Sequence, residues 1–339
     1  MKIFITGATG FLGQTILSHL DEKGLMKENQ ITALVLPNDR YEKDILKYAE
    51  IHILHGNVSD RDFLIEALKD QDIVIHTAGL ISYWKKDYDK LVKVNIEGTK
   101  NIVEACLTNK IRRLVHISSV GTVGFYKDGT YADEQTKFNW PENFYYMTTK
   151  RDGEKYVMDA INNKGLNAII LNPASIMGPM DPNPDTPHNQ VYKMVLTGTA
   201  FFSFSGGLAI VDVRDLADIA IKAAFTEDRG KYLIIGHNIS YVTVLKTCGK
   251  YLNKKVLAIP VPPVFLFLGG HLLEFISNFT NKRPLITASY GRLSGFKAYY
   301  SNKKSIDTFS HKYIDFEKTI EDACKYYKEV HWHKKTLRK

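Results

Sequence analysis

Cysteine is scarce in this sequence of 339 residues, which holds only Cys106, Cys248 and Cys324. Their odd number and wide spacing exclude a disulfide framework, and no Cys-x-x-Cys pair indicates a metal site. We therefore expect reduced, mostly buried thiols that behave as small apolar side chains, and no bound metal.

Long apolar runs are also absent. The most apolar region, residues 256–279, is interrupted by three prolines, His271 and Glu274, and its clean runs fall far short of the roughly 20 residues that span a bilayer. We expect this region to cap a ligand pocket, with contact to a membrane surface as the alternative. The first strand begins almost at Met1 without a secretory leader, so we expect a cytoplasmic protein.

The sequence lacks a concentrated basic block before its C-terminal end, although its formal net charge is +8. Lysines are spread along the chain, and only residues 331–339 are clearly basic. We expect a solvated tail there and no nucleic-acid partner, because no nucleic-acid-binding motif is present. Low-complexity tracts and internal repeats are missing too, which leaves the composition of an ordinary α/β enzyme.

The first half of the sequence alternates β-rich runs with segments of helical spacing. The β-rich runs are residues 3–6, 31–36, 51–55, 73–76, 114–118 and 168–171. The alternation predicts right-handed crossovers and a doubly wound parallel sheet of the Rossmann type. In such a sheet the ligand binds beyond the carboxyl ends of the strands, so functional residues should follow the strands directly.

A turn with three glycines follows the first β-rich run. Gly7 allows a sharp turn, Gly10 lets backbone amides approach a ligand, and Gly13 lets the following helix pack closely on the sheet. An anion placed there would lie at the positive end of the helix dipole. The spacing Gly-x-x-Gly-x-x-Gly in this context predicts a dinucleotide-binding site.

The second half is less regular. A proline-rich stretch opens it, and the segment around residues 211–225 reads as a strand and a helix that return to the first domain. We therefore expect a nucleotide-binding domain of residues 1–174 and 206–236. Residues 175–205 and 237–330 would form a smaller, interleaved C-terminal substrate-binding lobe, followed by the basic tail 331–339.

Tyr146 and Lys150 open a segment with helical spacing. Residues four apart share a helix face, so the phenol and the ammonium can meet. A nearby cation stabilises a phenolate and brings the tyrosine pKa closer to neutral pH, as a group that exchanges protons requires. The pair follows Ser118 and Ser119 at the end of the fifth β-rich run, which favours a catalytic role.

Together these motifs resemble the extended short-chain dehydrogenase/reductases, the superfamily of NAD-dependent epimerase/dehydratases, with most similarity to dihydroflavonol-4-reductase and 3β-hydroxysteroid dehydrogenase-like members. The resemblance runs in register from Met1 to about Lys328. Its landmarks are Thr6–Gly13, Gly56–Asp60, Val74–Gly79, Val94–Thr99, His116–Ser119, Tyr146–Lys150, Asn172–Pro173, Gly178–Pro179 and Val211–Ala217.

The resemblance implies a role for each matched residue. Tyr146 would be the general acid/base, and Lys150 would hold the nicotinamide ribose and lower the tyrosine pKa. Ser119 would hydrogen-bond the reacting oxygen, and Asn95 would mostly support the site. The residues with implied cofactor contacts are Gly7, Thr9, Gly10, Phe11, Leu12, Gly13, Leu36, Arg40, Asn57, Val58, Ala78, Gly79, Asn95, Lys150 and Pro173.

The cofactor pattern departs from the superfamily at two places. Leu36 stands where an acid would bind the ribose of NAD, and Arg40 lies within reach of a 2′-phosphate, so we expect NADP(H). Asp39 keeps NAD(H) as the alternative. Asn57 stands where the superfamily has an acid that contacts the adenine amine, and its amide oxygen can still accept a hydrogen bond.

The expected reaction interconverts a secondary alcohol and a ketone on a partly apolar small molecule. Val120 follows Ser119 where dehydratases have an acidic pair, which argues against dehydration. The stretch 80–84 holds the aromatic residues Tyr83 and Trp84, as in reductase-like members. One alternative is a nucleotide-sugar epimerase with tightly bound NAD, and another is a non-catalytic NADP-sensing protein. Superfamily members often dimerise through helices that correspond to residues 94–107 and 146–160, so a homodimer is expected.

Overall fold

The computed structural model describes residues 1–280, 283–284 and 286–332. Its largest element is a seven-stranded sheet in the order β10-β6-β5-β4-β1-β2-β3, in which every neighbouring pair is parallel. The strands are β1 (Lys2–Thr6), β2 (Gln30–Val35), β3 (Ile51–His55), β4 (Ile73–His76), β5 (Arg113–Ile117), β6 (Ala168–Pro173) and β10 (Gly230–Ile234).

This sheet confirms the predicted fold class and all six predicted strands, while β10 was not predicted. The order reverses between β1 and β4, which is the switch point where doubly wound sheets bind ligands. The central strands are buried on both faces, as continuous apolar runs such as Ile3–Ile5 require.

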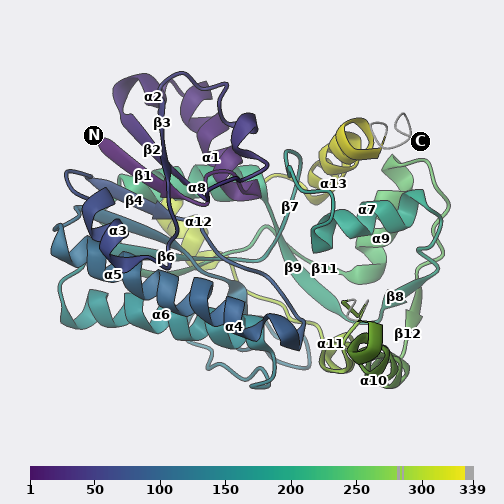
Figure 1. The fold of residues 1–339 in the computed structure, drawn as a ribbon. Helices are drawn as coiled ribbons and strands as arrows, with labels where there is room; N and C mark the ends of the chain where they lie inside the picture. Colours follow the sequence, from purple (N-terminus) through teal and green to yellow (C-terminus); the bar gives the residue numbers. More distant parts are fainter. Residues whose placement is uncertain (281–282, 285, 333–339) are drawn as a thin grey trace.

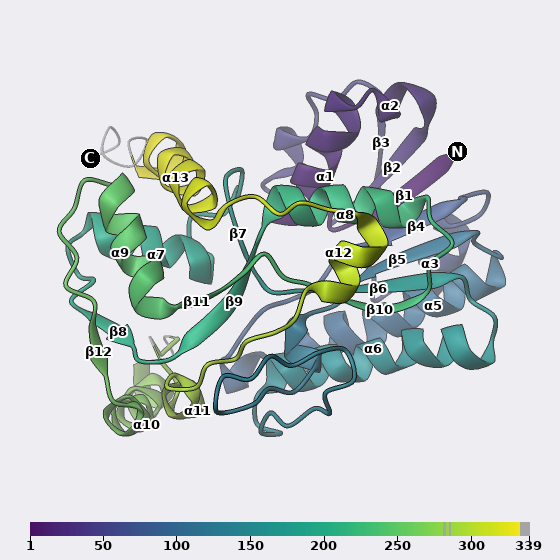
Figure 2. The same ribbon diagram turned by 180° about the vertical axis from the view of Figure 1, so that it is seen from behind.

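Helices cover both faces of the large sheet (Figures 1 and 2). On one face α1 (Phe11–Glu22) packs against α8 (Val213–Ala224), with α2 (Leu25–Glu28) beyond α1. On the other face lie α3 (Arg61–Ala67), α5 (Thr99–Thr108) and α6 (Tyr145–Asn163). Two separate clusters of buried apolar side chains, one under each layer, form the core around the sheet.

The helix expected at residues 94–107 begins earlier in the structure, and part of it has the wider turn of a π-helix. It continues from α4 (Tyr88–Leu91) through a π-helical stretch, Val92–Gly98, into α5. Gly153 of α6 explains the close contact here, because a Cβ at Gly153 would overlap the Asn95 carbonyl oxygen. The widened turn thus places Asn95 tightly against α6, and π-bulges of this kind recur at functional sites.

A smaller unit lies beside the carboxyl ends of the large sheet. It holds a three-stranded sheet of β7 (Ser175–Met177), β9 (Gly207–Asp212) and β11 (His237–Ser240), and a strand pair, β8 (Phe202–Phe204) and β12 (Ile259–Val261). Around a core of their own pack α7 (Pro187–Leu196), α9 (Tyr241–Tyr251) and α13 (Phe316–Tyr326).

The segment 206–236 divides between these two parts. Its helix α8 and strand β10 lie with the large sheet, whereas β9 belongs to the three-stranded sheet. Later in the chain, α12 (Lys303–Phe309) contacts β10. The domain boundaries given above stay a prediction. The expected basic tail falls mainly at 333–339, outside the described residues.

Two helices lie at the lower edge of the smaller unit in the view of Figure 1, where α10 (Pro263–Thr280) packs on α11 (Ala288–Leu293). Among the described helices, none combines the length and the apolar character that crossing a bilayer demands. Cys106, Cys248 and Cys324 are all buried and form no disulfide.

Candidate active site

The glycine turn lies between β1 and α1 and has the backbone that the sequence predicts. Gly7 has a φ of +67°, and a Cβ there would lie 2.7 Å from the Thr77 hydroxyl. A Cβ at Gly13 would overlap the Gly7 carbonyl oxygen. Gly10 precedes α1 in an extended conformation without a side-chain cap, so no side chain occupies the first amides of the helix. This cradle fits a dinucleotide diphosphate.

The other residues of the turn have different surroundings. Thr9 donates a hydrogen bond of 2.7 Å from its hydroxyl to the Asp39 carboxylate. Phe11 stacks on His188 with ring centroids 5.1 Å apart. The Leu12 side chain is buried in the core, so only its backbone can meet a ligand.

The loop after β2 holds the residues expected to select the cofactor. Leu36 is 51% exposed. Arg40 donates to the Asn183 side chain at 3.2 Å and lies 4.5 Å above the Tyr41 ring. Asp39, through Thr9, is tied to the glycine turn, whereas Arg40 is engaged by residues beside it. The Asp39 carboxylate therefore lies against the glycine turn, and the Arg40 guanidinium lies in the same loop.

Four more predicted cofactor residues follow strands of the large sheet. Asn57 is exposed after β3, and its side-chain oxygen accepts from a backbone amide two residues on at 3.0 Å. Val58 is buried against the helical layer. Ala78 follows β4 and donates its amide to the Thr6 hydroxyl at 3.2 Å. Pro173 ends β6 and is buried.

The structure brings Ser119, Tyr146 and Lys150 together at the carboxyl end of β5. Ser119 and Tyr146 are joined by a side-chain hydrogen bond. Lys150 donates to the Ile117 carbonyl oxygen at 2.9 Å. A Cβ at Gly79 would lie 3.7 Å from the Lys150 ammonium, so the chain after β4 also approaches this group. Three elements thus converge on one point.

Burial decides the protonation of these groups. It raises the pKa of Tyr146 above its usual value, and the hydrogen bond with Ser119 opposes that effect. We expected the Lys150 cation to lower the tyrosine pKa, but in this structure the influences on that pKa are burial and the Ser119 hydrogen bond. Burial also lowers the pKa of Lys150 to about 8, against the attraction of Glu154.

Asn95 is buried in the π-helical stretch and fastens the chain after β4. Its amide accepts from the Leu80 backbone at 2.9 Å, donates back to it at 3.0 Å, and donates to Thr149 at 3.3 Å. Both the oxygen and the nitrogen of the Asn95 amide are therefore bonded within the protein, as expected of a residue that supports the site.

Sequence reasoning missed Glu154, a buried carboxylate one turn beyond Lys150 on α6. It accepts hydrogen bonds from the Ser118 hydroxyl at 2.5 Å, from Thr122 at 2.8 Å and from Asn172 at 2.6 Å. It also pairs with Lys231 of β10. Its position four residues after Lys150 was the available signal, because these two residues share a helix face.

Two histidines lie opposite each other on the adjacent strands β4 and β5. The rings of His76 and His116 stack with centroids 5.3 Å apart. His76 makes a hydrogen bond of 2.7 Å to the Thr6 hydroxyl. Burial lowers the pKa of His76 to about 3 and that of His116 well below its usual value, and the Lys150 cation adds to both effects. Both rings are therefore neutral at physiological pH.

Aromatic side chains from distant parts of the sequence extend from Tyr146 into the smaller unit. The Tyr83 ring packs against the Tyr146 ring, with centroids 5.8 Å apart, and against the Tyr290 ring of α11, with centroids 5.2 Å apart. The ring of Phe204 in β8 contacts the Tyr290 ring at a centroid distance of 5.4 Å and the Tyr241 ring of α9 at 5.0 Å. Sequence analysis singled out the stretch holding Tyr83, but not Phe204, Tyr241 or Tyr290.

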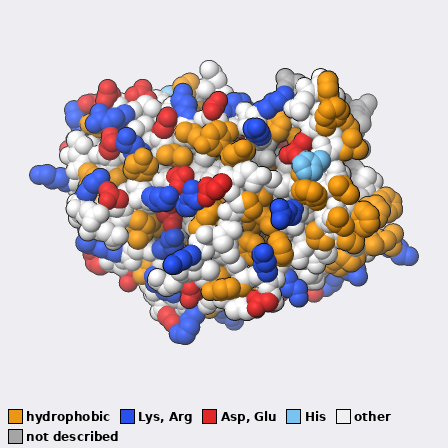
Figure 3. All heavy atoms as spheres, turned by 90° about the horizontal axis from the view of Figure 1, so that it is seen from below, with side chains coloured by type: hydrophobic (Ala, Val, Ile, Leu, Met, Phe, Trp, Pro, Cys, Tyr) orange, Lys and Arg blue, Asp and Glu red, His pale blue; other side chains and the backbone are white. Residues whose placement is uncertain are grey.

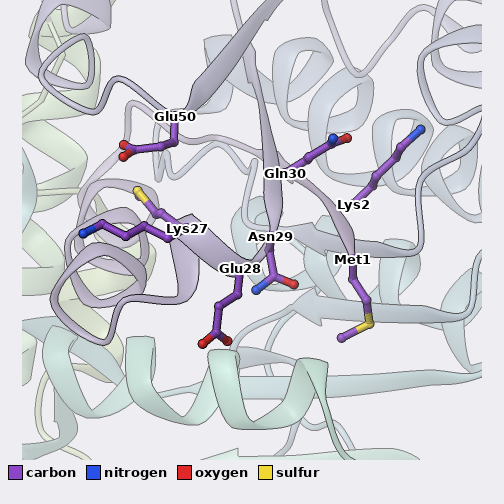
Figure 4. A pocket seen from close by; sticks show the side chains of 8 residues that line it. Met1, Lys2, Lys27, Glu28, Asn29, Gln30 and Glu50 are labelled. Carbon is purple, nitrogen blue, oxygen red and sulfur yellow. The ribbon is translucent and has the colours of Figure 1, made fainter.

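An open hollow of about 550 Å³ lies elsewhere, at the amino ends of β1 and β2 (Figure 4). Met1 and Lys2, the segment Met26–Gln30 and Glu50 line it. None of the predicted site residues is among them. Within the described residues, no group of three or more histidine, cysteine or carboxylate side chains could hold a metal ion.

Comparison with known proteins gives these residues a context. Residues 4–243 match the 3-beta hydroxysteroid dehydrogenase/isomerase family. A Synechocystis sp. protein provisionally named dihydroflavonol 4-reductase is 28% identical, over 97% of this chain and 93% of its own length. A monkeypox virus protein named 3 beta-hydroxysteroid dehydrogenase/Delta 5-->4-isomerase is 30% identical, over 51% of this chain and 48% of its own length.

Solved structures share the fold. The crystal structure of gox2253 has a TM-score of 0.82 at 27% identity and covers 97% of this chain and 98% of its own. The Thermus thermophilus UDP-glucose 4-epimerase complex with NAD has a TM-score of 0.77 at 19% identity, over 97% and 100% of the two chains. The matches confirm the resemblance to the extended short-chain dehydrogenase/reductases and the expectation of an NAD(P)-dependent oxidoreductase. The chain belongs to the 3-beta hydroxysteroid dehydrogenase/isomerase family.

Proposed function

We propose that this protein interconverts a secondary alcohol and a ketone on a partly apolar small molecule, using a nicotinamide dinucleotide. The observation that carries the proposal is the convergence of Ser119, Tyr146 and Lys150 beside the glycine cradle. The names of the relatives in steroid and dihydroflavonol chemistry support it.

Side chains of this protein carry out the proton transfer. When bound, the dinucleotide supplies or accepts the hydride. In the reductive direction Tyr146 donates its phenolic proton to the carbonyl oxygen, and Ser119 holds that oxygen by a hydrogen bond. Since burial disfavours a phenolate at Tyr146, the tyrosine rests in the protonated form that donation requires. Lys150 would hold the ribose hydroxyls of the bound dinucleotide, and Asn95 fixes the chain that passes beside Lys150.

The substrate side is apolar. Tyr83, Phe204, Tyr241 and Tyr290 form a connected aromatic surface that begins at Tyr146. Rings of this kind present large apolar faces with a few hydroxyl groups, which suits fused-ring or aromatic ketones. This surface supports a ketone of the dihydroflavonol or 3β-hydroxysteroid type.

Two side chains bear on the choice of dinucleotide. Arg40 supports NADP(H), because a guanidinium near the ribose binds a 2′-phosphate. Asp39 supports NAD(H), because its carboxylate is held at the cradle by Thr9 and can accept from a ribose hydroxyl. NADP(H) stays our prediction, with NAD(H) as the alternative.

The test is reduction of a steroid ketone and a dihydroflavonol, followed by the loss of nicotinamide absorbance. We expect turnover by the wild type and a loss of at least about a hundredfold in kcat for Tyr146→Phe, since the proton donor is removed. Dinucleotide affinity should be unchanged in the variant. Tyr145→Phe, the adjacent tyrosine of α6, is the control. Equal rates for Tyr146→Phe and the wild type would contradict the proposal.

The second candidate is an epimerase, which the fold of the Thermus thermophilus enzyme favours. The same three residues would oxidise a sugar hydroxyl and then reduce the ketone from the other side. Such an enzyme keeps its dinucleotide and needs none added. Turnover of a nucleotide sugar without added cofactor would favour this candidate.

A further inference from the structure

The outer face of α10 is apolar and exposed. Phe265, Leu268, Leu272, Phe275 and Phe279 are each 59–76% exposed. Their spacing of three and four residues puts them on one stripe of the helix. A soluble helix normally turns such a stripe toward the core, so the exposure of this one calls for a covering surface.

The inner face of α10 is already occupied. Gly270 and Ser277 are its buried residues, and a Cβ at Gly270 would overlap the Ala288 backbone of α11. Gly291 likewise sits against the Leu266 carbonyl. The apolar stripe therefore cannot turn inward without breaking the contact between α10 and α11.

The exposed stripe continues onto neighbouring strands. Phe202 of β8 is 62% exposed, and Ile259 of the paired strand β12 is 50% exposed. Phe201 and Leu257, just before these strands, are exposed as well. Figure 3 shows apolar side chains gathered at this end of the molecule, with basic side chains around them. We call these residues and the stripe of α10 the apolar face.

The chain around the apolar face is almost without acids. Residues 241–300 contain one carboxylate, Glu274, against eight basic residues. The basic residues are Lys246, Lys250, Lys254, Lys255, Lys282, Arg283, Arg292 and Lys297. Among the described residues, the ion pairs of this segment join only Lys250 to Glu317 and Arg283 to Asp87. This one segment thus carries most of the chain's net charge of +8.

A hollow of about 190 Å³ lies at the start of α10. Pro263, Val264 and Phe267 are its apolar lining residues, and Arg292 lines it as well. Arg292 is exposed and in no ion pair with another described residue. An apolar recess next to a guanidinium matches an acyl chain next to a phosphate group.

We propose that the apolar face docks on a membrane rich in anionic phospholipid, with α10 lying in the plane of the interface. The apolar stripe would enter the boundary between headgroups and acyl chains, and the basic residues would face the lipid phosphates. A second copy of this chain is the less suitable occupant, because pairing the two faces would bring two basic rims together. Docking does not depend on which reaction the site performs.

The position of the face has a consequence for the substrate. α10 packs on α11, whose Tyr290 belongs to the aromatic surface that reaches Tyr146. A membrane bound by α10 would therefore lie next to the substrate side of the site. An apolar ketone dissolved in the bilayer would have a short path to the site.

The experiment is co-sedimentation of the full chain with two kinds of vesicle, phosphatidylcholine alone and phosphatidylcholine with phosphatidylserine. We expect binding to the second kind, weakened by added salt. Exchanging two exposed leucines, Leu268→Asn with Leu272→Asn, should lower the partition coefficient by about tenfold or more. Leu46→Asn is the matched control, since Leu46 is 61% exposed far from the stripe. It should bind as the wild type does.

A second variant tests the charge. Lys254→Glu with Lys255→Glu leaves the apolar stripe intact and should lower binding to the phosphatidylserine vesicles by about tenfold or more. Failure of the wild type to bind either vesicle would overturn the proposal, as would equal binding by the leucine variant. A dimer in solution that the leucine variant dissociates would assign the face to a second copy instead. Ketone reduction is assayed separately, so a failure of docking leaves the proposed reaction standing.

Discussion

The Lys150 ammonium is subject to opposing influences. Burial disfavours its charge, while Glu154 on the same helix favours it. The result is a pKa of about 8, so the ammonium is present below this pH and is lost above it. On the role proposed for Lys150, in which the ammonium would donate hydrogen bonds to the dinucleotide ribose, dinucleotide affinity should fall as the pH rises through 8.

Glu154→Gln removes the attraction and leaves the Lys231 cation unpaired nearby. Both changes lower the pKa of Lys150. The pH at which dinucleotide affinity falls should therefore move down by about one unit or more. Fluorescence titration with the dinucleotide across pH measures this shift. Asp152→Asn is the control on the same helix, because Asp152 pairs with Arg151 and Lys155 instead. Identical pH profiles for Glu154→Gln and the wild type would contradict the assignment.

The histidine pair predicts how stability depends on pH. The folded-state pKa of His76 is about 3, well below the value near 6.5 of an unfolded histidine, and that of His116 is also lowered. Their contribution is present above pH ~6.5 and is lost as the pH falls, because only the unfolded chain then takes up the protons. For each histidine, the free energy of unfolding should fall by roughly 1.4 kcal/mol for each pH unit below that value.

Urea unfolding of His76→Gln measures this contribution. The slope of stability against pH below about 6.5 should be smaller in the variant by roughly one proton's worth. His52→Gln, at an exposed histidine of β3, should leave the slope unchanged. If the slope of His76→Gln equals that of the wild type, the pair is not neutral in the folded state.

At the scale of elements, α10 depends on adjacent glycines that have opposite surroundings. A Cβ at Gly270 would overlap the backbone of Ala288, whereas a Cβ at Gly269 would meet no atom within 4 Å. We expect Gly270→Ala to lower stability by about 1–3 kcal/mol. Gly269→Ala should be neutral or stabilising by up to about 1 kcal/mol. Chemical denaturation separates the two, and equal effects would show that α10 is not held on α11 in this way.

Local patterns predicted the elements near the cradle well. The run Lys2–Thr6 followed by Gly7, Gly10 and Gly13 has local causes, namely β-propensity, a positive φ and close helix packing. The π-helical stretch had no such signal, because residues 94–107 have ordinary helical spacing. It lies at the close approach of Gly153 to Asn95, which is a contact between elements far apart in sequence.

Charge shows another limit. Counting lysines along the sequence gave an even distribution, but the basic character of residues 241–300 arises because Glu274 is the only acid there. A scan for missing acids would have found this segment. Its exposure at α10 could not be predicted, because an apolar stripe is typical of a helix packed on a core.

At the scale of the whole molecule, the site is built where the two parts of the chain meet. Phe11 of the cradle stacks on His188, and Arg40 reaches Asn183. Arg283 pairs with Asp87 at 2.7 Å. The aromatic surface likewise combines residues 83, 146, 204, 241 and 290, whose sequence spacing follows no pattern. Only tertiary structure could bring these side chains together.

The central claim is that the protein exchanges a nicotinamide dinucleotide in each turnover. The measurement is assay of the purified protein for bound dinucleotide, followed by titration with NADPH and NADH monitored by the fluorescence of Trp84 and Trp140. The account predicts protein free of dinucleotide that binds both reversibly, and NADPH more tightly. Tightly bound NAD that does not exchange would contradict the account and support the epimerase.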